Sequence, residues 1–378
     1  MTEGEVLLVY RDRIVPCSEA HFLRRQYVGF RRLTPVWIGR RVDAGLPELA
    51  TEPILLGRQG VVGALDRSLF KEFGRIPPQP DLAKLRPRLI HAHFGRGGAL
   101  ALPIARALEV PLVVTFHGGD ATKDKHYQRQ LVPTIFQRRC AALQREAALI
   151  ICTAEHIRNA LLRRGFPAAK LRVICYGVEP EADNCPVPPA ERPYLLFVGR
   201  FVEKKGIEYL LDAMRLLESK GAAVDLILIG DGPLSEVLRR QSNGLKSTRF
   251  LGWLPNQEVR RAMRGALAIC VPSVAARAGD SEGLPNVVIE GMAAAAPVIG
   301  SDHGGIGEAV EHGRTGFLVP PADSQAIAMA VLRLLGDPAL RRRMGLAARV
   351  EATEHFNAVV QSRLLEDTLL AVSHSPTG

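Results

Sequence analysis

The strongest constraint on the fold is the alternation of short apolar runs with helical patterns on both sides of one proline-dense stretch. Before that stretch, apolar runs such as residues 113–116 and 148–152 alternate with helical patterns such as residues 99–108. After it, the same alternation is carried by runs at residues 195–198, 226–229, 268–271 and 298–299. Buried strands that alternate with helices form parallel sheets covered by helices. The sequence therefore predicts two α/β domains.

The proline-dense stretch is Asn184-Cys-Pro-Val-Pro-Pro-Ala-Glu-Arg-Pro193, and its composition is typical of an interdomain linker. A chain of 378 residues is long enough for two domains of ordinary size. We expect an N-terminal domain over residues 1–185, a second domain over residues 186–360 and a helical tail over residues 361–378.

Charge and cysteine content narrow the class of protein. The net charge is +10, and residues 1–185 hold 28 Lys and Arg against 18 Asp and Glu, while residues 186–378 hold 21 of each. No run approaches the ~20 apolar residues of a membrane span, and the N-terminus shows no signal-peptide pattern. Six cysteines form no paired metal-binding spacing. We expect a cytoplasmic, reduced protein without a nucleic-acid partner.

Two carboxylates lie eight positions apart in Glu282-Gly-Leu-Pro-Asn-Val-Val-Ile-Glu290. Pro285 suits the first turn of a helix, so we expect Glu282 in the preceding loop and Glu290 about a turn and a half inside the helix. Free N–H groups at a helix start favour phosphate, and carboxylates accept hydrogen bonds from sugar hydroxyls. The stretch fits a nucleotide-sugar site, and it fits equally an ordinary capped helix with a solvated Glu282.

Three cations lie in the stretch Gly199-Arg-Phe-Val-Glu-Lys-Lys-Gly206, between a strand-like run and a helical pattern. Ligands of open α/β sheets bind at the carboxyl ends of strands. Arg200 can make a forked contact with a diphosphate, and Lys205 a point-charge contact. We interpret Lys204 as an ordinary solvated charge.

Together with Gly304-Gly-Ile-Gly-Glu-Ala-Val310, these stretches closely resemble the donor half of retaining GT-B glycosyltransferases of glycosyltransferase family 4. The resemblance covers about residues 194–360. It implies two Rossmann-like domains facing across a cleft, with part of the tail at residues 361–378 crossing back to the N-terminal domain.

The resemblance extends to residues 88–180 through His91-Ala-His-Phe-Gly95, Phe116-His-Gly-Gly-Asp120 and Tyr176-Gly-Val178. The first two of these stretches look most like those of exopolysaccharide and colanic-acid type transferases. This likeness implies a saccharide acceptor, lipid-linked in our interpretation, in exopolysaccharide or cell-envelope polysaccharide synthesis.

The resemblance also implies roles for single residues. Arg200 and Lys205 would hold the donor diphosphate, and Glu290 the ribose hydroxyls. Glu282 would contact the transferring sugar, and His117 would reach that sugar from the opposite domain. The implied donor-binding residues further include Gly283, Leu284, Gly304, Gly305 and Ile306, the last three through amides near the sugar and phosphate.

His117 directly follows the apolar run at residues 113–116, so it lies at the end of a strand, and Gly118 and Gly119 permit close approach of a ligand. This is a suitable place for a catalytic residue, and the alternative is a histidine hydrogen-bonded within the fold. Asp120 either caps the next turn or contacts the acceptor.

A metal is not expected. His91 and His93 share one face of a strand, as two metal ligands would, but no third ligand follows at a convincing spacing, so we expect a structural role. The sequence holds no Asp-x-Asp pair, and Arg200, Lys205 and helix N-termini can stabilise a leaving diphosphate. We predict an enzyme without metal or other cofactor.

The first strand-to-helix loop departs from the family's glycine-rich pattern and reads Arg11-Asp-Arg-Ile-Val-Pro-Cys-Ser-Glu19. A Ser-Glu pair opens the first helix in the exopolysaccharide branch, so the resemblance places Ser18 and Glu19, together with Asp120, on the acceptor side.

The predicted function is transfer of a sugar from a nucleotide-diphosphate sugar to a saccharide acceptor. No carboxylate pair looks like a double-displacement set. The resemblance implies retention through a front-side route in which the donor phosphate helps to deprotonate the acceptor hydroxyl and the His117 region stabilises the oxocarbenium charge. Two alternatives stay open: a nucleotide-sugar epimerase on the same fold, and a non-catalytic sugar-nucleotide-binding protein.

A last prediction concerns membranes. The segment from residue 18 to residue 32 repeats an arginine pair after seven residues, which on a helix would align Arg24 with Arg31 and Arg25 with Arg32. Its apolar residues either pack into the first domain or lie beside a surface for anionic lipid, where each basic residue contributes about 1 kcal/mol. We predict salt-reversible, peripheral association of residues 18–41 with the inner face of the plasma membrane.

Overall fold

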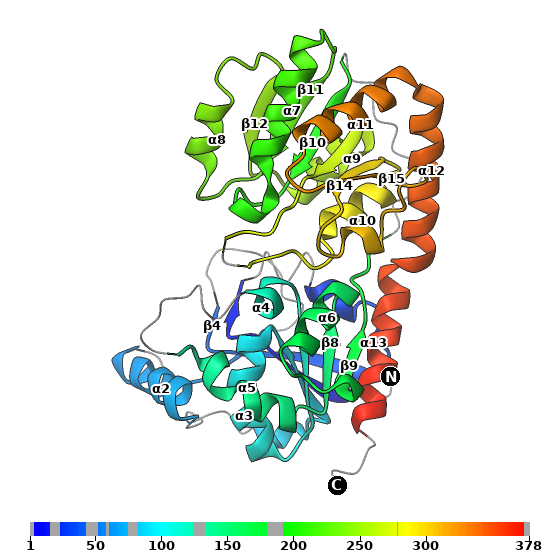
Figure 1. Ribbon diagram of the computed structural model, residues 1–378. Coiled ribbons are helices and arrows are strands. Elements are labelled where there is room, and N and C mark those ends of the chain that lie inside the picture. The colour runs from blue at the N-terminus through cyan, green and yellow to red at the C-terminus, as the bar shows by residue number, and fades with distance from the viewer. Residues whose placement is uncertain are drawn as a thin grey trace. The chain divides into compact units, whose positions relative to one another are not determined.

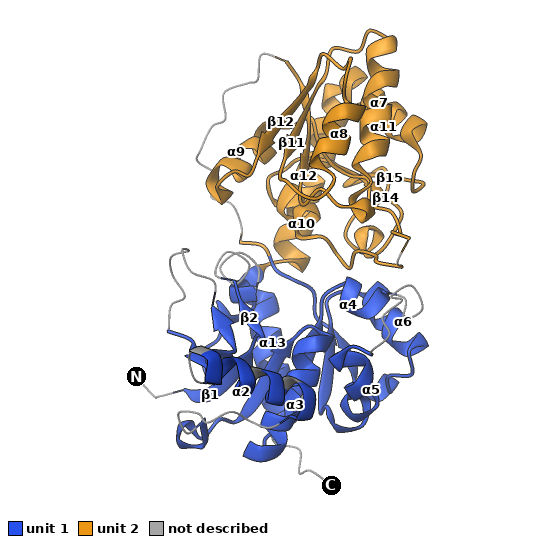
Figure 2. Ribbon diagram, turned by 90° about the vertical axis from the view of Figure 1, so that its left-hand side faces the viewer, with its two compact units in different colours: residues 1–177, 358–378 blue, residues 178–357 orange. Residues whose placement is uncertain are grey.

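The computed structural model describes residues 4–15, 23–42, 52–57, 60–74, 82–123, 133–179, 192–277 and 279–373 (Figure 1). Its contacts divide the chain into two compact units (Figure 2). Unit 1 comprises residues 1–177 with 358–378, and unit 2 comprises residues 178–357. Residues 184–191 of the expected linker at residues 184–193 lie outside the described residues, as do the candidate acceptor residues Ser18 and Glu19.

The described part of unit 1 contains a seven-stranded parallel sheet. In spatial order its strands are β5 (Ile54–Leu55), β3 (Leu33–Gly39), β1 (Glu5–Tyr10), β6 (Leu89–His93), β7 (Leu112–Phe116), β8 (Leu149–Cys152) and β9 (Leu171–Val173). The chain winds outward from β1 in one direction and from β6 in the other. The switch point, where α/β proteins bind ligands, therefore lies between β1 and β6.

Helices of unit 1 connect these strands. They are the α-helices α2 (Gly60–Phe73), α3 (Gly95–Leu108), α4 (Gly119–Thr122), α5 (Ile135–Glu146), α6 (Glu155–Arg163) and α13 (Ala358–Ser373), with the 3₁₀ helices η2 (Arg24–Tyr27), η3 (Leu82–Leu85) and η4 (Ala168–Lys170). A separate two-stranded sheet pairs β2 (Arg13–Ile14) with β4 (Arg41–Val42). Helix α3 lies close against β7, since a Cβ at Gly98 would meet Val114 at 2.7 Å.

The described part of unit 2 contains a six-stranded parallel sheet. In spatial order its strands are β12 (Thr248–Gly252), β11 (Asp225–Ile229), β10 (Tyr194–Val198), β13 (Ala268–Val271), β14 (Val298–Ser301) and β15 (Gly316–Val319). Its helices are η5 (Glu203–Lys205), α7 (Ile207–Ser219), α8 (Ser235–Gln241), α9 (Asn256–Gly265), α10 (Asn286–Ala293), η6 (Ile306–Glu308), α11 (Ser324–Gly336) and α12 (Pro338–His355). The switch point lies between β10 and β13. Both sheets confirm the predicted α/β, Rossmann-like fold class.

The described part of the expected tail belongs to one helix of unit 1, because α12 ends at His355 in unit 2 and α13 begins at Ala358 in unit 1. Leu365, Leu369 and Leu370 of α13 join the core of unit 1. The buried Glu366 carboxylate accepts N–H bonds of 2.7–2.9 Å from Arg31, Arg32 and Leu33. Helix α13 thereby fixes the chain between η2 and β3.

The predicted arginine stripe at residues 24–32 is wrong. Residues 24–27 form one turn of 3₁₀ helix, and the chain then turns into β3 at Leu33. Arg25 is buried, whereas Arg24 is exposed, so the two do not share a basic surface. Leu23 and Tyr27 pack into the core of unit 1. The chain cannot continue as a helix because Glu366 binds the backbone N–H groups of the connection.

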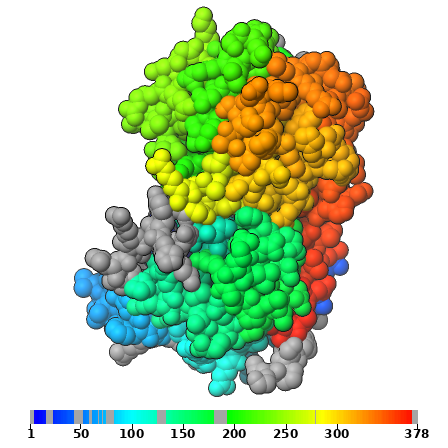
Figure 3. Space-filling view, in the orientation of Figure 1, coloured from blue at the N-terminus to red at the C-terminus, as the bar shows by residue number. Residues whose placement is uncertain are grey.

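The most exposed large apolar side chains in the described part of unit 1 lie on α2. Its atoms are visible on the surface in blue in Figure 3, and Val61 and Phe73 are 88% and 80% exposed. Within the described residues, no helix has both the length and the apolar character that crossing a bilayer requires.

Candidate active site

In unit 2, three loops meet at the carboxyl edge of neighbouring strands. They follow β10, β13 and β14, which lie side by side in the sheet. The loop after β10 passes so close to the loop after β13 that a Cβ at Gly206 would lie 2.0 Å from the carbonyl oxygen of Pro272. Gly206 also has a φ of +60°, which favours glycine. The position of this loop therefore depends on glycine.

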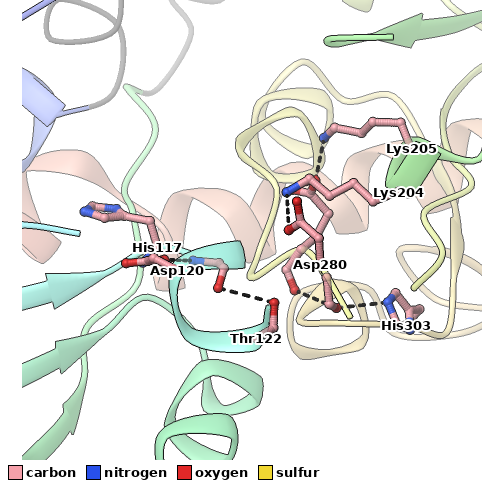
Figure 4. Close-up of polar contacts among 10 residues, drawn as sticks. His117, Asp120, Thr122, Lys204, Lys205, Asp280 and His303 are labelled. Carbon is pink, nitrogen blue, oxygen red and sulfur yellow. Dashed lines mark hydrogen bonds and ion pairs between the residues drawn. The ribbon is translucent and has the colours of Figure 1, made fainter. Parts of the chain in front are cut away.

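A cluster of two lysines and two carboxylates joins the first two loops (Figure 4). Lys204 Nζ lies 3.1 Å from Asp280 Oδ1 and 3.1 Å from Glu282 Oε1. Lys205 Nζ lies 3.4 Å from the same Glu282 oxygen. The interpretation of Lys204 as a solvated charge was wrong, because its side chain is only 21% exposed and bridges two carboxylates.

The charges of this cluster stabilise one another. Burial alone would raise the pKa of Glu282, but the ammonium groups of Lys205 and Lys204 outweigh it and hold that pKa below its usual range. Burial would lower the pKa of Lys204, and Glu282 and Asp280 together raise it. Glu282 is therefore ionised and held beside a cation that can bind phosphate.

The glycine-rich loop after β14 lies directly on the backbone of Glu282 and Gly283. Gly305 N donates to Gly283 O at 2.8 Å. Gly304 has a φ of +65°, and a Cβ there would lie 2.6 Å from Glu282 O. Next to this junction, Ser281 Oγ and His303 Nε2 are 2.9 Å apart (Figure 4). The structure thus brings Lys205, Glu282, Gly283, Gly304 and Gly305 together.

The remaining predicted donor residues lie around this junction or farther along the same loops. Arg200 is exposed in the loop after β10. Glu290 is partly exposed in the second turn of α10, for which Pro285 is the N-cap. The side chains of Leu284 and Ile306 are 3% and 0% exposed and belong to the core, so a ligand can reach only their backbone.

In unit 1, Asp120 holds the loops after β6 and β7 together. Its Oδ1 accepts from the backbone N–H groups of His117 and Gly118 at 3.0 and 2.9 Å, and its Oδ2 accepts from Gly95 N at 3.0 Å. Burial raises the pKa of Asp120, and these N–H groups oppose the shift. The Asp120 carboxylate therefore binds amides that precede α4 and does not cap the next turn, and its contact with the acceptor stays a prediction.

The His117 ring is hydrogen-bonded at both nitrogens. Its Nε2 lies 3.2 Å from His93 Nδ1, and its Nδ1 bonds to the hydroxyl of Tyr176. Burial, and then the charge of Arg11, lower the pKa of His117 well below its usual value. Phe94, whose ring packs at a tilt against His117 at a centroid distance of 4.2 Å, has a φ of +67°. Such backbone strain is typical of functional sites.

The histidines of β6 have a structural role, as expected. Tyr27 Oη bonds to His91 Nδ1 at 2.8 Å and to His93 Nε2 at 2.7 Å, and His91 Nε2 bonds to Thr115 Oγ1 at 2.7 Å. Burial lowers the pKa of His91 to about 3 and that of His93 well below its usual value. Sequence reasoning missed Tyr27, which is 64 residues from His91. It noted the Tyr176 stretch without assigning Tyr176 a role.

Comparison with known proteins agrees with this architecture. Residues 47–182 match the family model for Glycosyltransferase Family 4, and residues 192–337 match the model for Glycosyl transferases group 1. The chain is 32% identical over 288 residues to the amylovoran biosynthesis glycosyltransferase AmsK of Erwinia amylovora, which covers 73% of this chain and 68% of the relative. It is 30% identical over 300 residues to the putative colanic acid biosynthesis glycosyltransferase WcaL of Escherichia coli K12, covering 74% and 70%.

Solved structures agree on the fold. The Anabaena Alr3699/HepE protein in complex with UDP is similar with a TM-score of 0.74 and 19% identity, over 97% of this chain and 100% of that one. Sucrose-phosphate synthase from Thermosynechococcus elongatus gives a TM-score of 0.75 and 25% identity, over 98% and 100%. With two parallel α/β units and both family models matched in order along the sequence, the chain belongs to the GT-B glycosyltransferases of glycosyltransferase family 4.

Proposed function

We propose that this glycosyltransferase moves a sugar from a nucleotide-diphosphate sugar to a saccharide acceptor, lipid-linked in our proposal, in exopolysaccharide or cell-envelope polysaccharide synthesis. The observation that carries the proposal is the ion-pair cluster of Lys204, Lys205 and Glu282 beside the Gly304–Gly305 backbone. Relatives named for amylovoran and colanic acid biosynthesis support the role in polysaccharide synthesis.

The cluster suits the two ends of such a donor. A diphosphate carries charge that Lys205 and the exposed Arg200 can neutralise. The Glu282 carboxylate can accept hydrogen bonds from sugar hydroxyls. The groups proposed to bind the diphosphate and the sugar hydroxyls lie at the carboxyl edge of the unit 2 sheet, where α/β proteins bind nucleotides. Glu290 in α10 is proposed to bind the ribose.

The proposed reaction retains the anomeric configuration. The donor phosphate takes the proton of the acceptor hydroxyl on the side where the bond to the sugar breaks, and the His117 region stabilises the positive charge on the sugar. The lysines and backbone amides stabilise the leaving diphosphate, so we propose that no metal is needed.

A transfer assay tests this proposal against its two alternatives. Nucleotide sugars, starting with UDP-sugars because HepE was crystallised with UDP, are incubated with and without saccharide acceptors, and products are identified by mass spectrometry and anomeric NMR. Transfer to the acceptor supports the proposal. Acceptor-independent conversion of one nucleotide sugar to another indicates an epimerase, and binding without turnover indicates a binding protein.

We also propose peripheral association with the cytoplasmic face of the plasma membrane, with helix α2 as the contact surface instead of residues 18–41. Support comes from the basic excess of residues 1–185 and from Val61, Leu65 and Phe73 of α2, which are 60–88% exposed. Sedimentation with anionic and neutral vesicles, at low and high salt, compares the parent with a Val61→Ser, Leu65→Ser variant. Equal binding of both proteins to anionic vesicles would exclude α2 as the contact.

A further inference from the structure

A continuous hydrogen-bonded chain runs through the interior of unit 1. It connects Thr115, His91, Tyr27, His93, His117 and Tyr176 in that order. The first four contacts, from the Thr115 hydroxyl to His117 Nε2, are 2.7–3.2 Å long. Every ring nitrogen of the three histidines takes part.

The chain allows two arrangements of protons when the rings are neutral. A neutral imidazole carries one N–H and one lone pair, and a tyrosine hydroxyl between two rings donates to one and accepts from the other. If Tyr27 donates to His93, then His91, His93 and His117 all carry their proton on Nδ1. If Tyr27 donates to His91, all three carry it on Nε2.

Mixed arrangements break the chain. If His93 and His117 carried different tautomers, two N–H groups or two lone pairs would face each other at their contact. If His91 and His93 did, either the Tyr27 hydroxyl proton would lack an acceptor or one ring lone pair would lack a donor. His91 and His93 are 0% exposed, so water cannot restore the lost hydrogen bond. Burial keeps the rings neutral, with Arg11 adding to the effect at His93 and His117.

We propose that Tyr27 is a positioning residue that sets the tautomer of His117 through His93, so that the three histidines share one tautomer. Its consequence for the reaction rests on the proposed function, in which His117 acts on the sugar. Tyr27 itself is 9% exposed and bonded to His91 and His93. The tautomer decides whether each His117 nitrogen donates or accepts.

Contacts around Tyr27 fix the position of its hydroxyl between His91 and His93. Tyr27 is the last residue of η2, and its ring packs edge-on against Trp37 at a centroid distance of 5.9 Å. Just beyond η2, Gly29 N donates to Ser362 Oγ of α13 at 2.9 Å. Helix α13 and β3 thus hold the hydroxyl between the two histidines.

Nitrogen-15 NMR of protein labelled only at histidine tests the proposal directly, because long-range correlations distinguish Nδ1–H from Nε2–H rings. The parent should show His91, His93 and His117 as neutral rings of one tautomer. Tyr27→Phe removes only the hydroxyl, and His117 should then populate both tautomers. Tyr194→Phe is the matched control, because it removes another buried tyrosine hydroxyl. That hydroxyl donates to Ala262 O at 2.7 Å and is not part of the hydrogen-bonded chain.

Activity gives a second readout. Tyr27→Phe should lower kcat roughly two- to tenfold, the range of one hydrogen bond, with the dissociation constant of the donor unchanged. Tyr176→Phe, which perturbs the chain from its other end, should also change the His117 spectrum if Tyr27→Phe folds poorly. Different tautomers in the parent, or a His117 spectrum unchanged in a folded Tyr27→Phe variant, would overturn the proposal. The NMR result needs no donor, so a failed transfer assay leaves it intact.

Discussion

Replacing Lys204 with Gln removes the cation that bridges Asp280 and Glu282. The variant tests whether Lys204 stabilises the fold, while Lys205, the proposed ligand of the diphosphate, is left in place. Lys204 Nζ contacts both carboxylates at 3.1 Å, and the side chains of Lys204 and Glu282 are only 21% and 13% exposed. A charge-assisted contact of this kind contributes about 1.5 to 3 kcal/mol. Because Lys205 remains beside Glu282, we expect Lys204→Gln to lower the free energy of unfolding by about 2 kcal/mol.

The pKa shifts of Glu282 and Lys204 determine how the stability difference between parent and Lys204→Gln changes with pH. The pKa of Glu282 is depressed in the folded protein, so its contribution to stability is present above the unfolded value of about 4.3. That contribution is lost as the pH falls through the folded pKa. The pKa of Lys204 is raised, so its contribution is present below about 10.4 and is lost only as the pH rises through the folded pKa. The difference between parent and variant should be largest near neutral pH and shrink below pH ~4.

Urea unfolding at several pH values measures this difference. Lys220→Gln is the matched control, because Lys220 is an exposed residue at the end of α7, and it should change stability by less than about 0.5 kcal/mol. A Lys204→Gln variant as stable as the parent at neutral pH would refute the reasoning. A stability loss that stays constant as the pH falls below ~4 would refute it equally.

Three further predictions follow from the site. Lys205→Ala and Glu290→Ala should each weaken donor binding by about 1.5 to 3 kcal/mol in calorimetry, and unchanged affinity in both would remove them from the donor site. His117→Ala should lower turnover more than donor affinity, whereas equal turnover in variant and parent would exclude a role at the reacting sugar. EDTA should leave transfer activity intact, and a strict requirement for a divalent ion would show that the lysines and amides do not suffice.

The strands that position the site were predictable, because their signal is local. Runs such as residues 195–198 and 268–271 are buried on both faces and therefore read as continuous apolar sequence. Strand β12 was missed because its residues alternate between partly buried and exposed at the edge of the sheet. The tail was expected to begin at residue 361, whereas α13 begins at Ala358, because the break at Phe356 and Asn357 carries neither glycine nor proline.

The site was only partly predictable, because several of its contacts join segments far apart in the sequence. Lys204 pairs with Asp280, 76 residues away, and nothing in the local pattern distinguishes it from a solvated lysine. Tyr27 carries no motif, and its position between His91 and His93 depends on the packing of η2 against α13. The arginine stripe failed for the same reason, since Glu366 of α13 binds the backbone there.

The most direct test of the account is calorimetric titration of a nucleoside diphosphate and of its sugar conjugate into the parent, Lys205→Gln and Glu282→Gln. If Lys205 binds the diphosphate, Lys205→Gln weakens both ligands. If Glu282 binds the sugar, Glu282→Gln weakens only the conjugate, and it leaves the diphosphate bound as tightly as before or tighter, because Lys205 loses its partner at 3.4 Å. Equal loss of both ligands in Glu282→Gln, or no loss of either in Lys205→Gln, would contradict the proposed donor site.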